Sequence, residues 1–228
     1  MAASTRRAIA VAAAAACAAP VLASCAPTPA GPTVIGLVDT GVIVDAPQFE
    51  AYAIDQESPT VSGEHGTLVL SVLLGVAGDD DALPPKDVDV VSVDVGADAT
   101  ADDLAAGIEA ALDADVDVVS ISMGCRRGSP ALAAAVGRAE VLGTPIVAAA
   151  GNVRFLAPDY PARYASVIGV GAVAAGRRPW SESASDGVEV TALGVDVHAL
   201  DAHGEPRTVS GTSFATALAT HDLVLDLG

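Results

Sequence analysis

Short apolar runs alternate with longer stretches of helical pattern from residue 33 onward. Runs rich in Val and Ile, with few polar interruptions, are typical of parallel strands that are buried on both faces. Strands are therefore predicted at residues 33–38, 88–93, 116–121, 145–149, 167–172 and 188–192. Helical stretches between such strands predict an α/β fold, in which a mainly parallel sheet carries helices.

Local signals mark the helix ends. Thr100 and Asp103 have the spacing of a capping box, which predicts a helix from there to about residue 112. Ser129 followed by Pro130 predicts the start of another helix, which ends before Gly143. Two further helices are expected to begin near His65 and near Ser213. In sheets of this kind, functional sites form where strands end and helices begin.

The first 24 residues have the layout of an export signal. Arg6 and Arg7 precede an apolar run over residues 8–20, which is shorter than the roughly 20 residues of a membrane-spanning helix. The run leads to Leu-Ala-Ser-Cys at 22–25, which resembles a bacterial lipoprotein signal with Cys25 as the acylated first mature residue. The alternative is an ordinary secretory cut after Ala23. We therefore predict a signal peptide (1–24), a Pro-rich tether (25–32) and one domain (33–228) that is lipid-anchored outside the cytoplasm, or else secreted.

Composition and charge narrow the function classes. The 228 residues are 51% hydrophobic, which suits one globular domain rather than a disordered acidic tail. The formal charge of −18 argues against a nucleic-acid partner. Of the three cysteines, Cys17 leaves with the signal, Cys25 takes the lipid and Cys125 is interpreted as a small apolar filler, so no disulfide is expected. Under the plain secretory cut, a Cys25–Cys125 pair stays open.

Three motifs supply an acid, a base and a hydroxyl. Asp39-Thr40-Gly41 ends the first strand, His65-Gly66-Thr67 opens a helix, and Gly211-Thr212-Ser213 opens the last helix. A serine nucleophile needs an imidazole to take its proton and a buried carboxylate to orient the imidazole. Asp39, His65 and Ser213 fit those roles, although Asp39 alone also fits a loop cap and His65 alone a helix-start histidine. Asp-Thr-Gly also occurs in aspartic proteases, but those need a second such motif, and this chain has none.

The order Asp, His, Ser, with each motif at a strand end or a helix start, is similar to that of the subtilase family of serine proteases. Gly151-Asn152 after a strand and the segment from Tyr160-Pro161 to residue 172 extend the resemblance over nearly all of residues 34–220. The resemblance implies a subtilisin-like, three-layer, doubly wound sheet with helices on both faces. It also implies a serine endopeptidase that works through an acyl-enzyme, with Asn152 helping to hold the oxyanion.

The resemblance further implies where substrate binds. It assigns an extended-substrate edge to Ser122 and Gly124, and the opposite wall to Ala149 and Gly151. It places Asp159 near the floor of the primary specificity pocket, where a carboxylate favours Arg or Lys before the cut. The plainer alternative is a loop aspartate paired with Arg154 or Arg163.

Several features depart from the family pattern. Leu68 stands where a second His is usual, the helix after Ser213 lacks the usual Pro, and the chain leaves little room for a propeptide or C-terminal elements. The alternative function is therefore a weak or inactive subtilase-like lipoprotein that binds peptides at the cell surface. The serine is followed by Phe-Ala rather than the x-Gly of an α/β-hydrolase elbow, and neither a phosphate loop nor zinc spacing is present.

The composition and the resemblance together indicate which partners to expect. We expect protein or peptide substrates, no nucleic acid, membrane contact through the lipid only, and a monomer. No cofactor and no metal ligands are assigned, although the resemblance leaves calcium open without a legible ligand set. His198, His203 and His221 are assigned surface or hairpin positions without a function.

Overall fold

The computed structural model describes residues 31–56, 61–78, 82–154, 156–184, 186–188 and 190–227. The predicted signal peptide, Cys25 and most of the tether lie outside the described residues. Those predictions therefore stay predictions.

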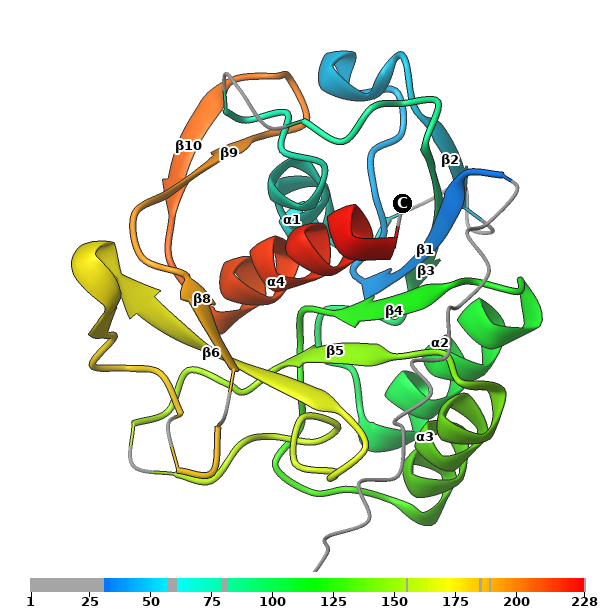
Figure 1. Ribbon diagram of the computed structural model, residues 1–228, viewed down its shortest axis with the longest axis vertical. Helices are drawn as coiled ribbons and strands as arrows, with labels where there is room; N and C mark the ends of the chain where they lie inside the picture. Colours follow the sequence, from blue (N-terminus) through cyan, green and yellow to red (C-terminus); the bar gives the residue numbers. More distant parts are fainter. Residues whose placement is uncertain are drawn as a thin grey trace, which may run out of the picture.

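One central sheet runs through the described part of the molecule (Figure 1). Its strand order is β2-β3-β1-β4-β5-β6-β7, with β8 also paired to β6. All pairs are parallel except that of β6 with β7. The strands are β1 (Thr33–Asp39), β2 (Ala53–Gln56), β3 (Val88–Asp94), β4 (Val118–Ile121), β5 (Ile146–Ala149), β6 (Ile168–Ala174), β7 (Arg178–Pro179) and β8 (Val190–Leu193). β4 and β5 are buried along their whole length, as their continuous apolar sequence predicts.

Helices cover both faces of this sheet (Figure 1). α2 (Ala101–Asp113) and α3 (Pro130–Leu142) pack side by side on one face, and α1 (His65–Leu73) and α4 (Thr212–Leu227) pack together on the other. Each face has its own apolar core. Leu104, Ile108 and Leu132 belong to the first core, and Leu70 and Phe214 to the second. The predicted three-layer, doubly wound α/β fold is confirmed.

The helix boundaries follow the signals in the sequence. The Thr100 side chain accepts from the backbone of Asp103, whose carboxylate accepts from the backbone of Thr100, so the capping box is present. Ser129 caps α3 by accepting from Leu132 N, with Pro130 as the first helical residue. Gly143 ends α3 with a φ of 78°, in the left-handed region that glycine adopts without strain.

Some elements were not predicted. β9 (Val197–Leu200) and β10 (Pro206–Val209) form a separate antiparallel hairpin, and short 3₁₀ turns occupy Pro47–Phe49 and Ala175–Arg177. The hairpin carries His198 and His203 on its exposed surface, as expected. The expectation for His221 is wrong, because this residue is only 6% exposed and its Nδ1 lies 2.8 Å from the Leu73 carbonyl oxygen. His221 therefore joins α4 to the end of α1.

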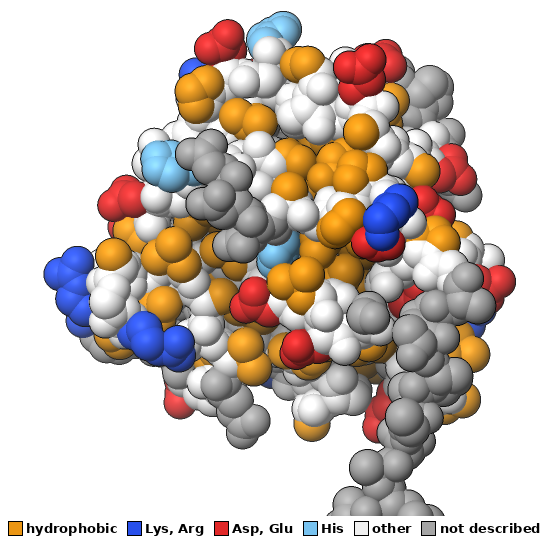
Figure 2. Space-filling view, turned by 45° about the horizontal axis from the view of Figure 1, so that its top comes forward, with side chains coloured by type: hydrophobic (Ala, Val, Ile, Leu, Met, Phe, Trp, Pro, Cys, Tyr) orange, Lys and Arg blue, Asp and Glu red, His pale blue; other side chains and the backbone are white. Residues whose placement is uncertain are grey.

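The surface carries charge in small groups. On the face shown in Figure 2, hydrophobic and uncharged side chains cover most of the area, and basic side chains stand in a few separate places. Among the helices of the described ranges, none is both long and apolar enough to cross a bilayer.

Candidate active site

Asp39 is the last residue of β1, near the middle of the sheet, and it is fully buried. Its Oδ1 accepts a hydrogen bond of 2.7 Å from Thr40 N and lies 2.8 Å from Nδ1 of His65. A carboxylate in this position fixes Nδ1 as the protonated nitrogen and leaves Nε2 free to accept a proton. The two residues are 26 positions apart in the sequence, and they meet because β1 ends and α1 begins at the same edge of the sheet.

His65 is the first residue of α1, and the loop after β1 holds that helix start in place. Gly66 N donates to Thr40 Oγ1 at 3.0 Å, and Ile43 N donates to Thr67 Oγ1 at 2.9 Å. A β-carbon on Gly66 would lie 2.2 Å from the carbonyl oxygen of Gly41. Glycine is thus required beside His65, because only its bare backbone allows this close approach.

The environment of His65 shifts its ionisation. Burial lowers the pKa of His65, whereas the hydrogen bond to Asp39 and the negative charge of Asp39 raise it, and the net result is a raised pKa. The imidazolium is therefore stabilised relative to a free histidine. Such a group is suited to take a proton and then to give it back.

Ser213 is the second residue of α4 and is 9% exposed. Its hydroxyl donates a hydrogen bond of 2.7 Å to the carbonyl oxygen of Ser122, and the Ser122 hydroxyl donates to the Ser213 carbonyl oxygen at 3.2 Å. The next residue, Phe214, packs against His65 with ring centroids 5.7 Å apart. The structure thus bonds Asp39 to His65 and brings the start of α4 beside the imidazole.

Asn152 lies just after β5 and is bonded to the start of α4. Its Oδ1 accepts from both the backbone N and the Oγ1 of Thr212, each at 2.9 Å. These two bonds fix the amide orientation and leave the Nδ2 group as a donor. Thr212 was not predicted as a site residue. Its position directly before Ser213, at a helix start where Thr side chains bond locally, is the signal that could have found it.

The predicted substrate-binding residues lie at the ends of β4 and β5: Ala149 is the last residue of β5, and the others come after the strands. Gly151 N donates to Thr212 Oγ1 at 3.1 Å, which ties the β5 end to the start of α4. Asp159 lies between the two strand ends, and its Oδ1 pairs with Nη1 of Arg126 at 2.5 Å. Arg126 was not predicted. Its pairing could not be read from the sequence, because 33 positions separate it from Asp159.

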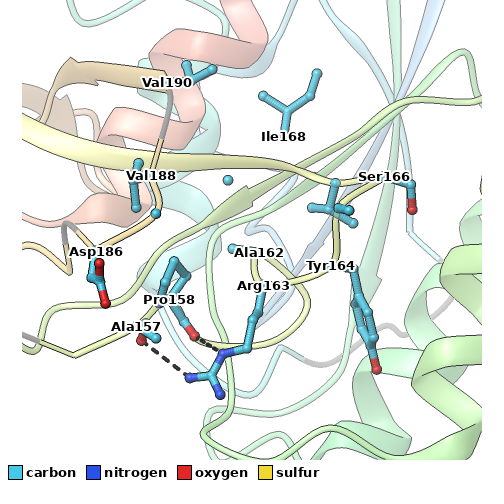
Figure 3. Close-up of a pocket in the computed structure, with 14 residues that line it drawn as sticks. Ala157, Pro158, Ala162, Arg163, Tyr164, Ser166, Ile168, Asp186, Val188 and Val190 are labelled. Atoms are coloured by element: carbon cyan, nitrogen blue, oxygen red, sulfur yellow. Dashed lines mark hydrogen bonds between the residues drawn. The ribbon is translucent and has the colours of Figure 1, made fainter.

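Arg163, one of the two cations considered for Asp159, bonds to backbone instead. Its Nε donates to Pro158 O at 2.7 Å and its Nη2 to Ala157 O at 3.4 Å (Figure 3). Arg163 lines a cavity of about 530 Å³ that lies between residues 157–169 and the segment before β8, with residues 186–188 and Val190 on that side. Neither Ser213 nor Asn152 lines this cavity, so it is separate from the candidate active site.

The comparisons with known proteins agree with this geometry. Residues 31–225 match the model of the subtilase family. The chain belongs to the subtilase family. The subtilase is 34% identical over 160 residues to a thermostable alkaline protease from Halalkalibacterium halodurans; the match covers 67% of this chain but 44% of that protein, so the chain spans less than half of its length.

Solved structures resemble the subtilase in fold. The patellamide maturation protease PatA is 26% identical, with a TM-score of 0.74 over 86% of this chain and 78% of that one. The prenylagaramide maturation protease PagA, at 24% identity, gives a TM-score of 0.75 over 85% of this chain and 74% of that one. The latter likeness concerns the fold alone.

The sequence assigns no metal ligands and leaves calcium binding open. Within the part of the chain that the structure describes, no group of three or more His, Cys, Asp or Glu residues is arranged to hold a metal ion. The sequence expectation about calcium is thus neither supported nor contradicted.

Proposed function

We propose that this subtilase is a serine endopeptidase that uses Asp39, His65 and Ser213 as a catalytic triad. The observation that carries the proposal is the contact of 2.8 Å between buried Asp39 and His65, beside the helix start that bears Ser213. A buried carboxylate that orients an imidazole next to a serine is the arrangement that activates a hydroxyl nucleophile.

The chemistry begins with formation of the acyl-enzyme. Ser213 Oγ attacks the carbonyl carbon of the scissile bond while its proton passes to His65 Nε2. The negative charge that develops on the carbonyl oxygen is held by Asn152 Nδ2 and by the backbone N–H of Ser213, which lies in the first turn of α4, where N–H groups lack intrahelical acceptors. The C–N bond then breaks, and His65 gives its proton to the leaving amine.

Water completes the reaction. It attacks the acyl carbon as His65 Nε2 takes one of its protons, the bond from the carbon to Ser213 Oγ breaks, and the proton returns to the serine. Asp39 holds the ring of His65 in place throughout and stabilises the imidazolium. Peptide substrate adds as an extended strand between the edge at Ser122 and Gly124 and the wall at Ala149 and Gly151, which gives a grip that tolerates many sequences.

Hydrolysis of an unstructured protein tests the proposal. We expect cleavage of β-casein by the purified protein, and a loss of about 10⁶-fold for Ser213→Ala if the triad acts as a unit. Ser210→Ala is a matched control, because this exposed hydroxyl accepts from Asp196 N, outside the site. A folded protein that binds casein peptides without cleaving them would favour the alternative of an inactive peptide-binding subtilase.

We also propose that the subtilase is anchored outside the cytoplasm through Cys25. The support is the Leu-Ala-Ser-Cys sequence at 22–25, which follows two arginines and an apolar run. Cys25→Ala should release the protein from membranes, and the intact mass of the wild-type protein should show acylation at a first residue Cys25. An unmodified mass that begins at Ser24 would indicate plain secretion.

A further inference from the structure

The space between the ends of β4 and β5 is closed by a salt bridge within the chain. Arg126 Nη1 donates to Asp159 Oδ1 at 2.5 Å and also to the carbonyl oxygen of Ala157 at 3.0 Å. The Asp159 side chain is 13% exposed, whereas that of Arg126 is 46% exposed. The carboxylate thus points inward, and the guanidinium covers it from the solvent side.

Two glycines show how fully Asp159 fills this space. A β-carbon on Gly151 would lie 2.4 Å from Asp159 Oδ2, and one on Gly124 would lie 2.8 Å from Asp159 Cβ. Both distances are shorter than real carbon contacts, so the two walls approach Asp159 as closely as glycine permits. The side chain of Asp159 therefore occupies the floor between the walls.

Backbone bonds hold Asp159 in that position. Asp159 N donates to Ala150 O at 2.9 Å, and Tyr160 exchanges hydrogen bonds of 2.8 and 2.9 Å with Cys125. The segment that carries Asp159 is thus bonded to both walls. These bonds fix the backbone of Asp159, and the pair with Arg126 holds its carboxylate.

Both walls of this space are bonded to the helix start that carries Ser213. Ser213 Oγ bonds to Ser122 O, two residues before Gly124, and Gly151 N bonds to Thr212, the residue before Ser213. A side chain directly before the scissile bond would therefore enter between Gly124 and Gly151. It would meet the Arg126–Asp159 pair there.

We infer that Arg126 and Asp159 together set the specificity of this site, an inference that rests on the proposed function. The pair makes the subsite shallow and electrically neutral, so it accepts a small uncharged side chain such as Ala or Ser. Asp159 alone would favour Arg or Lys. Arg126 removes that preference, because a substrate cation could pair with Asp159 only by displacing a cation already present, which exchanges one ion pair for another without gain.

Binding measurements on the Ser213→Ala protein test this inference without turnover. The probes are short fluorescein-labelled peptides that differ only in the carboxyl-terminal residue, Ala or Arg, and the readout is fluorescence anisotropy. We expect the Ala peptide to bind about tenfold more tightly. Adding Arg126→Ala should reverse the preference to about tenfold in favour of Arg, because a charge-assisted pair with Asp159 becomes available. Further addition of Asp159→Asn should abolish the gain.

Two further variants serve as a control and as a substitute for Arg126→Ala. Arg127→Ala removes the neighbouring exposed arginine and should leave the preference unchanged. Arg126→Gln removes the charge but keeps the aliphatic stem of the side chain, and it replaces Arg126→Ala if thermal unfolding shows that the alanine variant is not folded. The inference would be overturned if the Arg126 variants left the ratio of the two peptide affinities unchanged. It would also be overturned if the Ser213→Ala protein preferred the Arg peptide or bound neither peptide.

The two proposals fail separately. Discrimination between the peptides as expected, with no hydrolysis by the Ser213-containing protein, would contradict only the proposed endopeptidase. Equal hydrolysis after Ala and after Arg would contradict only the role of Arg126 and Asp159.

Discussion

The hydroxyl of Ser213 donates its hydrogen to the carbonyl oxygen of Ser122, at 2.7 Å. A hydroxyl carries one hydrogen, so in this arrangement the proton is not shared with His65. Transfer to His65 therefore requires the hydroxyl to give up its hydrogen bond to Ser122 O. The Asp39–His65 pair, by contrast, is already formed, so the base is oriented before the nucleophile releases Ser122 O.

The pH dependence of acylation should report the raised pKa of His65. Only neutral His65 can accept a proton, so the acylation rate should rise with pH through a midpoint above the ordinary value of about 6.5. Asp39→Asn removes the negative charge of residue 39 and leaves at most a neutral hydrogen bond to His65, so the effects that raise this pKa weaken while burial, which lowers it, remains. The midpoint should then fall relative to the wild-type protein, and kcat should drop roughly 10⁴-fold. Rates of acylation measured from pH 5 to 9 check this, and an unchanged midpoint in Asp39→Asn would be inconsistent with the role of Asp39.

Two substitutions separate the functions of the Asn152 amide. Asn152→Asp keeps an oxygen that accepts from Thr212 but loses the Nδ2 donor, whereas Asn152→Ala loses both. Both should lower kcat roughly 10²- to 10³-fold with little change in KM, because the donor acts on charge in the transition state. Only Asn152→Ala should also lose about 1 kcal/mol of stability per missing hydrogen bond. Steady-state kinetics with urea unfolding measure both effects; full activity of Asn152→Asp would exclude the oxyanion role.

Gly66 and Gly137 make a contrasting pair of helical glycines. Gly66→Ala would place a carbon 2.2 Å from Gly41 O, so it should destabilise the protein by roughly 1–3 kcal/mol and displace His65. Gly137→Ala on α3 meets no atom within 4 Å and should stabilise the protein by about 1 kcal/mol with unchanged activity. Thermal unfolding and hydrolysis rates check both. Equal stability and equal activity of the two variants would show that the close contact between residue 66 and Gly41 O does not constrain the protein.

Local and periodic features were predictable from the sequence. The buried strands, the capping box at Thr100 and the Ser129–Gly143 limits of α3 each depend on neighbouring residues or on complete burial, which the sequence displays directly. The order of the motifs around Asp39, His65 and Ser213 could be read because a doubly wound sheet collects strand ends and helix starts at one edge.

Features that depend on distant partners were missed. β2 is a short edge strand with partly exposed residues, so its sequence lacks the apolar run of a central strand. His221 is buried because the Leu73 carbonyl on another helix accepts its hydrogen bond. Arg126 reaches Asp159 only because the ends of β4 and β5 are adjacent. In each case the position depends on contacts with residues that are distant in the sequence, so neighbouring residues do not reveal it.

The most direct test of the triad is covalent labelling by a fluorophosphonate, followed by mass spectrometry of the peptides. We expect one adduct, on Ser213, and its loss in Ser213→Ala. Labelling should slow by several orders of magnitude in His65→Ala, since the serine then lacks its base. A folded wild-type protein with no adduct on Ser213, or labelling that is equally fast without His65, would contradict the proposed triad.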